Sequence, residues 1–249
     1  MSSQRPDSQT ESRQRIIDDY FETTSSAGLQ EERDYRAATA GLARGLGNWL
    51  DVDGKRVVDL GSGTGELCWL ASERGASQVV GVNLSRGEID YASSHVSANF
   101  VCADVLDYLK AAETASVDRI FALNLLEHLP DDTLVELLEQ GSRVLAPGGA
   151  LVAMVPNAIS PFGGMTRYWD FTHFRAFTPS SVRQLMKLAR FNAAEFREWG
   201  PRPHGMISIV RYALWQVVRL GIAFRLMIET GSAKERVYTA DMLFRLVRL

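Results

Sequence analysis

Short apolar runs rich in β-branched residues alternate along the chain with segments in which apolar residues recur every three or four positions. The runs fall at 56–60, 78–82, 99–103, 117–123 and 149–155, and each predicts a strand. The segments between them have helical spacing, most clearly at Leu134, Leu137 and Leu138. Strands that alternate with helices predict βαβ units, and therefore an α/β fold with a doubly wound, mostly parallel sheet.

The residues before the first strand predict a tail and a helical cap. Residues 1–14 are polar, which predicts a disordered tail rather than a signal peptide. Helical spacing then occurs twice, at Ile16, Ile17, Tyr20 and Phe21 and again at Leu42, Leu46, Trp49 and Leu50. We expect one domain over 15–249, with the cap at 15–52 and the core at 53–200.

The composition excludes only a few classes of function. With 249 residues and 46% hydrophobic content, the chain can bury the core of one domain with appendages. The net charge of −3 argues against a general nucleic-acid binder. Cys68 and Cys102 lie in apolar segments and are expected to be small core residues. Two such cysteines predict no disulfide framework or zinc site, which suits a reducing compartment and a cytoplasmic location.

Residues 57–66 carry the strongest chemical signal. An apolar run ends in Asp59 and leads into Gly61-Ser62-Gly63-Thr64-Gly65, after which the pattern becomes helical. Glycines in such a turn let the backbone approach a ligand closely, and the helix that follows directs free N–H groups at it. A dinucleotide fingerprint would require glycine at position 66, which is Glu66, so a nicotinamide oxidoreductase is disfavoured.

The pattern Asp-x-Gly-x-Gly-x-Gly at 59–65 resembles motif I of the class I S-adenosylmethionine (SAM)-dependent methyltransferases. Later segments resemble the same family in the same order: Asn83 ends the second strand, Asp104 follows the third, Asn124-x-x-Glu127-His128 follows the fourth, and a Pro-Gly-Gly turn precedes the fifth. This resemblance over 57–157 implies a Rossmann-like methyltransferase fold with seven strands, the last one antiparallel and within 237–249. It also implies SAM as the cofactor.

The resemblance implies a set of cofactor-binding residues. These are Asp59, Gly61, Ser62, Gly63, Gly65, Asn83, Leu84, Asp104, Val105 and Asn124. The glycines would admit the methionine end of SAM, position 83 would bind the ribose and Asp104 the adenine amino group. The family usually has an acid where this chain has Asn83, whose amide makes neutral and therefore weaker hydrogen bonds. Asp104 also fits a helix N-cap.

The segment 167–179 is dense in aromatic residues and follows the fifth predicted strand. Its Asp170-x-Thr172-His173 resembles a branch of the family often associated with glycans, lipid-linked sugars and secondary metabolites. We expect His173 to be the general base, oriented by Asp170, because an imidazole pKa near about 6.5 suits a hydroxyl acceptor at neutral pH. His128 is the second candidate. Either histidine could instead only order its loop, and His204 is a weaker third candidate.

These residues predict O-methylation of a hydroxyl on a small molecule or glycan, such as a sugar or a secondary metabolite. The alternatives are N- or C-methylation of an amino sugar or a quinone-like ring, and a non-catalytic SAM-binding partner. In the quinone-biosynthesis O-methyltransferases, which the segment also resembles, Glu and His at positions 127 and 128 join another Glu in holding a divalent metal. That further position is Asn124 here, and an amide oxygen is a poorer ligand for Mg²⁺, so we expect no metal.

The C-terminal part is basic, with eight Lys and Arg against three Asp and Glu over residues 201–249. We expect a helical insertion or lid at 201–236, in which 207–228 is apolar except for Arg211, Arg219 and Arg225 on one side of a helix. Three arginines argue against a spanning helix. Packing over the sheet, as a lid or in a homodimer contact, is favoured over peripheral contact with an anionic membrane.

Overall fold

The computed structural model describes residues 34–232, 234 and 236–249. The tail predicted at 1–14 and the first helix of the predicted cap, at 16–21, lie outside these residues. The strands are β1 (Arg56–Leu60), β2 (Gln78–Asn83), β3 (Asn99–Cys102), β4 (Val117–Leu123), β5 (Leu145–Pro156), β6 (Ala193–Glu198) and β7 (Asp241–Val247). The helices are α2 (Tyr35–Leu46), α3 (Glu66–Glu73), α4 (Arg86–His95), α5 (Val105–Ala111), α6 (Asp131–Val144), α7 (Gly163–Tyr168), α8 (Pro179–Leu188) and α9 (Met206–Thr230), with 3-10 turns η3 (Gly47–Trp49) and η4 (Leu126–His128).

The strands form one seven-stranded sheet in the order β3-β2-β1-β4-β5-β7-β6. β1 to β5 pair in parallel, and β7 runs antiparallel between β5 and β6. The predicted doubly wound, mostly parallel sheet with an antiparallel last strand is therefore confirmed. In such a sheet, ligands bind beyond the carboxyl ends of the strands near the point where the strand order reverses, which here lies between β1 and β4.

The sixth strand is the element that the hydrophobic pattern did not locate. β6 lies at the edge of the sheet and pairs only with β7, and none of its side chains is fully buried. Its sequence Ala-Ala-Glu-Phe-Arg-Glu contains Phe196 as its one large apolar residue. An edge strand that buries so little apolar surface leaves almost no periodic signal.

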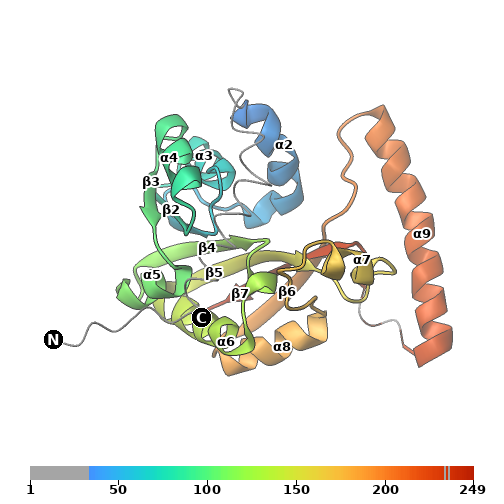
Figure 1. Ribbon diagram of the computed structural model, residues 1–249. Coiled ribbons are helices and arrows are strands. Elements are labelled where there is room, and N and C mark those ends of the chain that lie inside the picture. The colour runs from blue at the N-terminus through green and yellow to red at the C-terminus, as the bar shows by residue number, and fades with distance from the viewer. Residues whose placement is uncertain (1–33, 233, 235) are drawn as a thin grey trace.

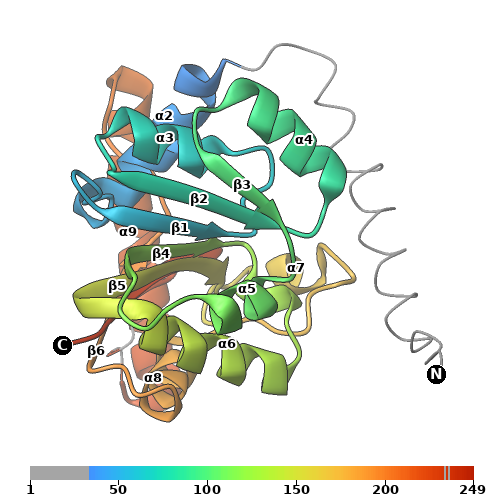
Figure 2. The ribbon, with the colours of Figure 1, turned by 90° about the vertical axis from the view of Figure 1, so that its left-hand side faces the viewer.

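Helices cover the sheet on both faces and enclose two hydrophobic clusters (Figure 2). One cluster lies between the sheet and α2, α3 and α4, and includes Leu46, Trp49 and Cys68. The other lies between the sheet and α5, α6 and α8. Cys68 is buried as predicted, whereas Cys102 is exposed because β3 is an edge strand, so the prediction of a second core cysteine is wrong.

The described part of the predicted cap packs against the first helix of the core. Asp34 caps α2 by accepting a hydrogen bond from the backbone N–H of Ala37. The Tyr35 hydroxyl donates to the backbone carbonyl of Thr64 at 2.7 Å, and its ring stacks on that of Trp69. The cap is therefore fastened directly to the glycine-rich turn.

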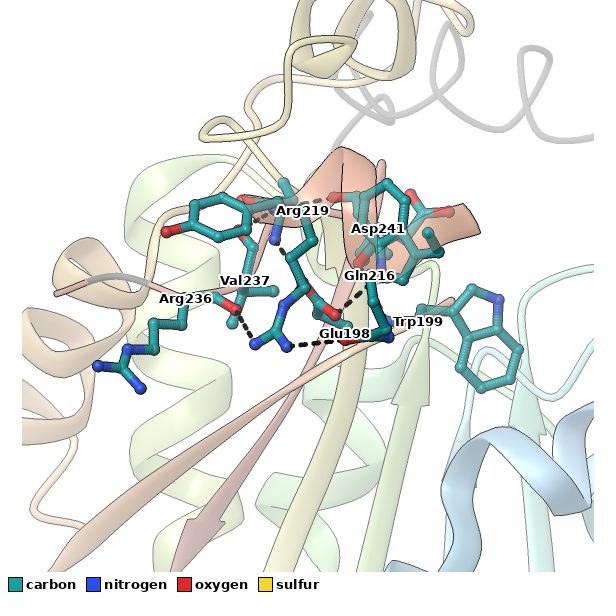
Figure 3. A network of polar contacts seen from close by, with 11 residues as sticks. Glu198, Trp199, Gln216, Arg219, Arg236, Val237 and Asp241 are labelled. Carbon is teal, nitrogen blue, oxygen red and sulfur yellow. Dashed lines mark hydrogen bonds and ion pairs between the residues drawn. The ribbon is translucent and has the colours of Figure 1, made fainter. Parts of the chain in front are cut away.

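The long helix α9 stands at the side of the molecule, outside the two helical layers (Figure 1). Ser208 is its one fully buried residue. The predicted helix is present, and its role as a lid or in a homodimer contact stays a prediction. Arg219 on its inward side bonds to Glu198 on β6 (Figure 3). Trp215 bonds to the same carboxylate, whereas most of the large apolar side chains of α9 are exposed. Within the described residues, α9 is the helix long and apolar enough to cross a membrane, judged by length and composition alone.

Candidate active site

The glycine-rich turn connects the carboxyl end of β1 to α3, as the sequence predicts. Gly61, Gly63 and Gly65 all have positive φ, at 73°, 51° and 89°. A Cβ atom on Gly65 would lie 3.0 Å from the ring of Phe100, so this glycine is required by packing as well as by its backbone conformation. A Cβ on Gly63 would meet only Glu88, at 3.9 Å, so the turn is open on the side that faces α4.

Asp59 supports this turn from behind. Its side chain is buried, and the Cys68 thiol lies 3.7 Å from its carboxylate. Burial, with a smaller effect from the charge of Glu66, raises the pKa of Asp59 to about 8. The side chain is therefore largely neutral at pH 7, and it is enclosed in the protein rather than presented to a ligand.

The turn also contains a buried polar group without a hydrogen-bond partner. The Ser62 side chain is 5% exposed, and its hydroxyl oxygen has no hydrogen-bond partner among the residues that the structure describes. Buried hydroxyls normally have a partner, so an unpaired one beside open glycine backbone favours a polar ligand at this place. The turn is therefore chemically suited to the amino-acid end of SAM.

A carboxylate from the helix that follows β2 lies at the carboxyl end of this strand. The Asn83 amide nitrogen donates to Glu88 Oε2 at 2.6 Å, and its Oδ1 accepts from the backbone N–H of Leu84 at 3.0 Å. Glu88 lies in the first turn of α4, which Ser85 caps. Asn83 thus holds the carboxylate of Glu88 next to Gly63, and Glu88 is a functional candidate that motif reasoning missed.

Asp104 caps α5, as its alternative interpretation predicted. Its Oδ1 accepts hydrogen bonds from the backbone N–H groups of Leu106 and Asp107, at 2.8 and 3.4 Å. Val105 behind it is buried, and Leu84 is half-buried at the end of β2. These residues lie beyond the carboxyl ends of adjacent parallel strands, because β2 pairs with β3.

Asn124 lies between two parts of the sheet edge. One is the cofactor side, formed by the glycine-rich turn and the end of β2, and the other is the acceptor side, which contains His128 and His173. It follows β4 with a φ of 54°, a left-handed conformation that Asn tolerates better than most residues. Its backbone N–H donates to the carbonyl of Met154 at 3.0 Å. The next residue, Leu125, lies 3.3 Å from where a Cβ of Gly61 would be, so the turn η4 directly adjoins the glycine-rich turn.

The structure brings the two histidine candidates together. The rings of His128 and His173 meet edge to face, with centroids 4.6 Å apart. Nδ1 of His173 lies 3.0 Å from the carbonyl oxygen of Thr166, which can only accept, so this nitrogen is the protonated one. Nε2 of His173 is then a free base, as a proton acceptor requires.

Asp170 acts on His128, not on His173 as predicted. Its Oδ1 accepts from both the hydroxyl and the backbone N–H of Thr172, at 2.7 and 2.8 Å. The Thr172 oxygen in turn lies 2.7 Å from Nδ1 of His128. Since Thr172 gives its proton to Asp170, its oxygen accepts from His128. The reason for the wrong partner is that the chain turns at 170–173, which directs the Asp170 side chain back towards η4.

The electrostatics of this cluster are set by burial. Burial, with help from the charge of His173, lowers the pKa of His128 to about 4. Burial raises the pKa of Glu127 to about 8, and its Oε2 has no hydrogen-bond partner within the described part of the chain. Burial would raise the pKa of Asp170, but the Thr172 bonds and the two imidazoles outweigh it and lower that pKa. At pH 7 the cluster therefore holds a neutral His128, a mostly neutral Glu127 and an ionised Asp170.

Three of these side chains could hold a metal ion. Glu127, His128 and His173 each offer one ligand atom, and these atoms lie within 4.8 Å of one another. Carboxylate and imidazole donors suit divalent transition metals. The expectation that the chain uses no metal stays a prediction. The remaining candidate, His204, is exposed and bonds through Nδ1 to the carbonyl of Arg202, and the structure does not bring it to the cluster.

Residues 57–149 match the family model described as a methyltransferase domain. The chain is 37% identical over 111 residues to methyltransferase GfsG of Streptomyces halstedii, a stretch covering 41% of this chain and 38% of that protein. It is 34% identical over 112 residues to a ubiquinone biosynthesis O-methyltransferase of Xanthomonas oryzae pv. oryzae, covering 43% of this chain and 46% of that protein. The matched stretches thus span less than half of these relatives.

A solved SAM-dependent methyltransferase from Archaeoglobus fulgidus has the same fold. It superposes with a TM-score of 0.64 at 19% identity, covering 86% of this chain and 95% of that one. The sheet order, the glycine-rich turn at the end of β1 and the family model agree with one another. SAM is the cosubstrate of this fold family, and the residues around the turn fit it. Residues 57–149 are therefore a methyltransferase domain, and the fold around them is that of the class I SAM-dependent methyltransferases.

Proposed function

We propose that this protein transfers a methyl group from SAM to a hydroxyl of a small-molecule or glycan acceptor, with His173 as general base. The observation that carries the proposal is the His128–His173 pair, which adjoins the glycine-rich turn through Leu125. When bound, SAM supplies an activated methyl group on a positively charged sulfur. The protein then has to align the acceptor and remove its proton.

The acceptor hydroxyl would donate its proton to Nε2 of His173. The Thr166 carbonyl holds Nδ1–H and so maintains the tautomer that leaves Nε2 basic. His128 cannot take this role equally well, because its pKa of about 4 makes it a weaker base. His128, held by Thr172 and Asp170, would instead position the ring of His173, which it meets edge to face.

Glu88 would supply the ribose-binding carboxylate that the family usually has at position 83. An ionised carboxylate that accepts from two ribose hydroxyls binds more strongly than a neutral amide. The short bond from Asn83 orients Glu88, and the open side of Gly63 faces it. Ser62 and the glycine backbone would bind the amino-acid end of SAM, and Asp104 the adenine.

Calorimetric titration followed by an acceptor screen tests the proposal. SAM and S-adenosylhomocysteine should bind with micromolar affinity and NAD⁺ should give no heat. Acceptors that offer a sugar hydroxyl, a catechol or an amine are then compared by transfer of a labelled methyl group. Transfer to hydroxyl acceptors that is lost in His173→Ala supports the proposal. Transfer to amines that does not depend on either histidine would replace it with N-methylation.

Metal-assisted O-methylation is the second candidate, and the Glu127–His128–His173 cluster favours it. It predicts that a chelator abolishes turnover and that added Mg²⁺, Mn²⁺ or Zn²⁺ restores it. The proposal with His173 as the base predicts turnover that a chelator does not change. A metal ligand uses the lone pair of His173 Nε2 to bind the ion, whereas a general base uses the same lone pair to take a proton. Because one lone pair cannot do both, the two outcomes exclude each other.

A further inference from the structure

The outer face of α9 is apolar over its whole length. We define this face by Val210, Leu214, Val217, Leu220, Phe224 and Ile228, each of which is more than half exposed. These residues recur at helical spacing over a helix of roughly 37 Å. Soluble proteins rarely expose a continuous apolar surface of this extent unless it binds something.

Hydrogen bonds from the polar side of α9 to the rest of the protein fix the orientation of this helix, with its apolar face outward. Arg219 donates to Glu198 Oε1 at 3.1 Å and to the backbone carbonyl of Arg236 at 3.3 Å (Figure 3). The indole N–H of Trp215 donates to the other oxygen of Glu198, and Glu198 also accepts from the backbone N–H of Tyr238. One half-buried carboxylate thus fastens the inner side of α9 to β6 and to the segment before β7.

The charges around α9 are mostly positive. Residues 201–236 contain six Lys and Arg against two Asp and Glu. Arg211 and Arg225 on the helix are exposed and lie beside the apolar face. Arg197, Arg202, Lys234 and Arg236 lie behind the helix, where they line the cleft of about 470 Å³ between α9 and β6 together with Glu195 and Glu198. An apolar helix face bordered by basic residues is complementary to a surface of anionic lipid headgroups, with the acyl chains beneath them.

A second copy of the chain fits this face less well. Arg211 and Arg225 lie equally far from the helix midpoint at Val218. An antiparallel pair of α9 helices would therefore place Arg211 of one copy beside Arg225 of the other, and a parallel pair would place each arginine beside its own equivalent. Like charges at such positions destabilise a helix pair. A spanning orientation is disfavoured because Arg219 is bonded to the body of the protein.

We propose that the outer face of α9 binds the surface of a membrane that contains anionic lipids. This inference does not depend on the proposed methyl transfer. It is consistent with a second set of exposed aromatic side chains, including Trp169 and Phe171, on the segment 157–178 between β5 and α8, which we call the acceptor loop. Phe162 of that loop lines the same cleft as Val218 and Ile222 of α9.

Vesicle flotation tests the proposal. The full chain should float with vesicles of phosphatidylcholine containing about 30% phosphatidylglycerol, and less with phosphatidylcholine alone. The double variant Val217→Asp/Leu220→Asp should lower the floated fraction at least tenfold, since it places two charges in the apolar contact. The matched control is Leu188→Asp/Leu249→Asp, which changes two exposed leucines elsewhere and should float like the unchanged protein.

Thermal unfolding would establish that both double variants are folded, since all four positions are exposed. Failure of the unchanged protein to float, or equal flotation of Val217→Asp/Leu220→Asp, would overturn the proposal. Equal flotation with neutral vesicles would overturn an anionic surface as the occupant. A dimer in light scattering that this variant dissociates, without flotation, would assign the face to a second copy and overturn it as well.

Discussion

The cofactor side and the acceptor side adjoin at the same edge of the sheet but are built in different ways. On the cofactor side, the groups proposed to bind SAM lie close together in the sequence: the three glycines lie in one turn, and Asn83 bonds to Glu88 five residues later. On the acceptor side, the contacts join distant segments, since His128 bonds to Thr172 across 44 residues and Phe174 donates to the carbonyl of Glu127. SAM binding should therefore withstand changes in the acceptor loop, whereas catalysis should not.

The largest expected effect comes from breaking the acceptor side alone. His173→Ala removes the proposed base and should lower kcat by roughly 10²–10⁴. The Kd for SAM should stay nearly unchanged, because the groups proposed to bind SAM are the glycine-rich turn and Glu88, not His173. Steady-state kinetics and calorimetry on the same preparation measure both values. Unchanged turnover would remove His173 from the mechanism.

Breaking the cofactor side should have the opposite signature. Glu88→Gln removes a charged acceptor and should raise the Kd for SAM about 10–100-fold, with little effect on kcat at saturating SAM. Asp90→Asn, an exposed acid on the same helix, is the matched control and should bind SAM normally.

Exchanging the amide of position 83 with the carboxylate of position 88 sharpens this test. Asn83→Asp alone places two carboxylates at a distance now spanned by a 2.6 Å hydrogen bond, and should weaken binding. Asn83→Asp combined with Glu88→Gln restores one carboxylate and one amide, and should recover most of the affinity. A double variant that binds no better than either single variant would exclude Glu88 as a ribose ligand.

Thr172→Val tests the long-range part of the acceptor side. The change keeps the shape of the side chain but removes the oxygen between Asp170 and His128. We expect kcat to fall about tenfold, which corresponds to about 1.4 kcal/mol of lost orientation. Thr172→Ser keeps the oxygen and should retain most activity. Equal rates for Val and Ser would show that His128 needs no orienting partner.

The smallest expected effect is on the stability of the protein and comes from Asp59, which lies behind the glycine-rich turn. Asp59 has a folded-state pKa of about 8, above its unfolded value of about 3.9. Its contribution to the free energy of unfolding is therefore fully present below the unfolded pKa and is lost as the pH rises towards 8. Asp59→Asn should therefore raise the free energy of unfolding by at least about 1 kcal/mol at pH 8 and have no effect at pH 4. Urea unfolding at the two pH values measures this difference, and an equal effect at both would contradict the raised pKa.

The local character of the cofactor side explains why it could be predicted. Asp59, Gly61, Gly63 and Gly65 are encoded within seven residues, and the strand before them carries a continuous apolar run. The helix-cap alternative for Asp104 was equally visible, because a cap depends on adjacent residues. The number of strands and the antiparallel direction of the last one followed from the family resemblance rather than from the hydrophobic pattern.

The acceptor side could be predicted only as a set of candidates. His128 and His173 were identified by residue type, but their contact and the route from Asp170 to His128 depend on how the loop folds back. Glu127 was part of the same motif, yet its burial was not visible in the sequence. Glu88 was missed because its role depends on the angle between β2 and α4. A carboxylate five residues after an unexpected Asn, in the first turn of the following helix, is the signal that could have found it.

The fastening of α9 through Glu198 also has a consequence for how the chain behaves at high concentration. β6 is an outer edge of the sheet, and unpaired backbone groups on such an edge invite strand addition by another chain. α9 and the residues around Arg219 stand over this edge, while Glu195 and Arg197 place charges along it. Loss of the Glu198–Arg219 bond would therefore expose a surface for aggregation, so this ion pair serves the colloidal stability of the protein as well as the placement of its helix.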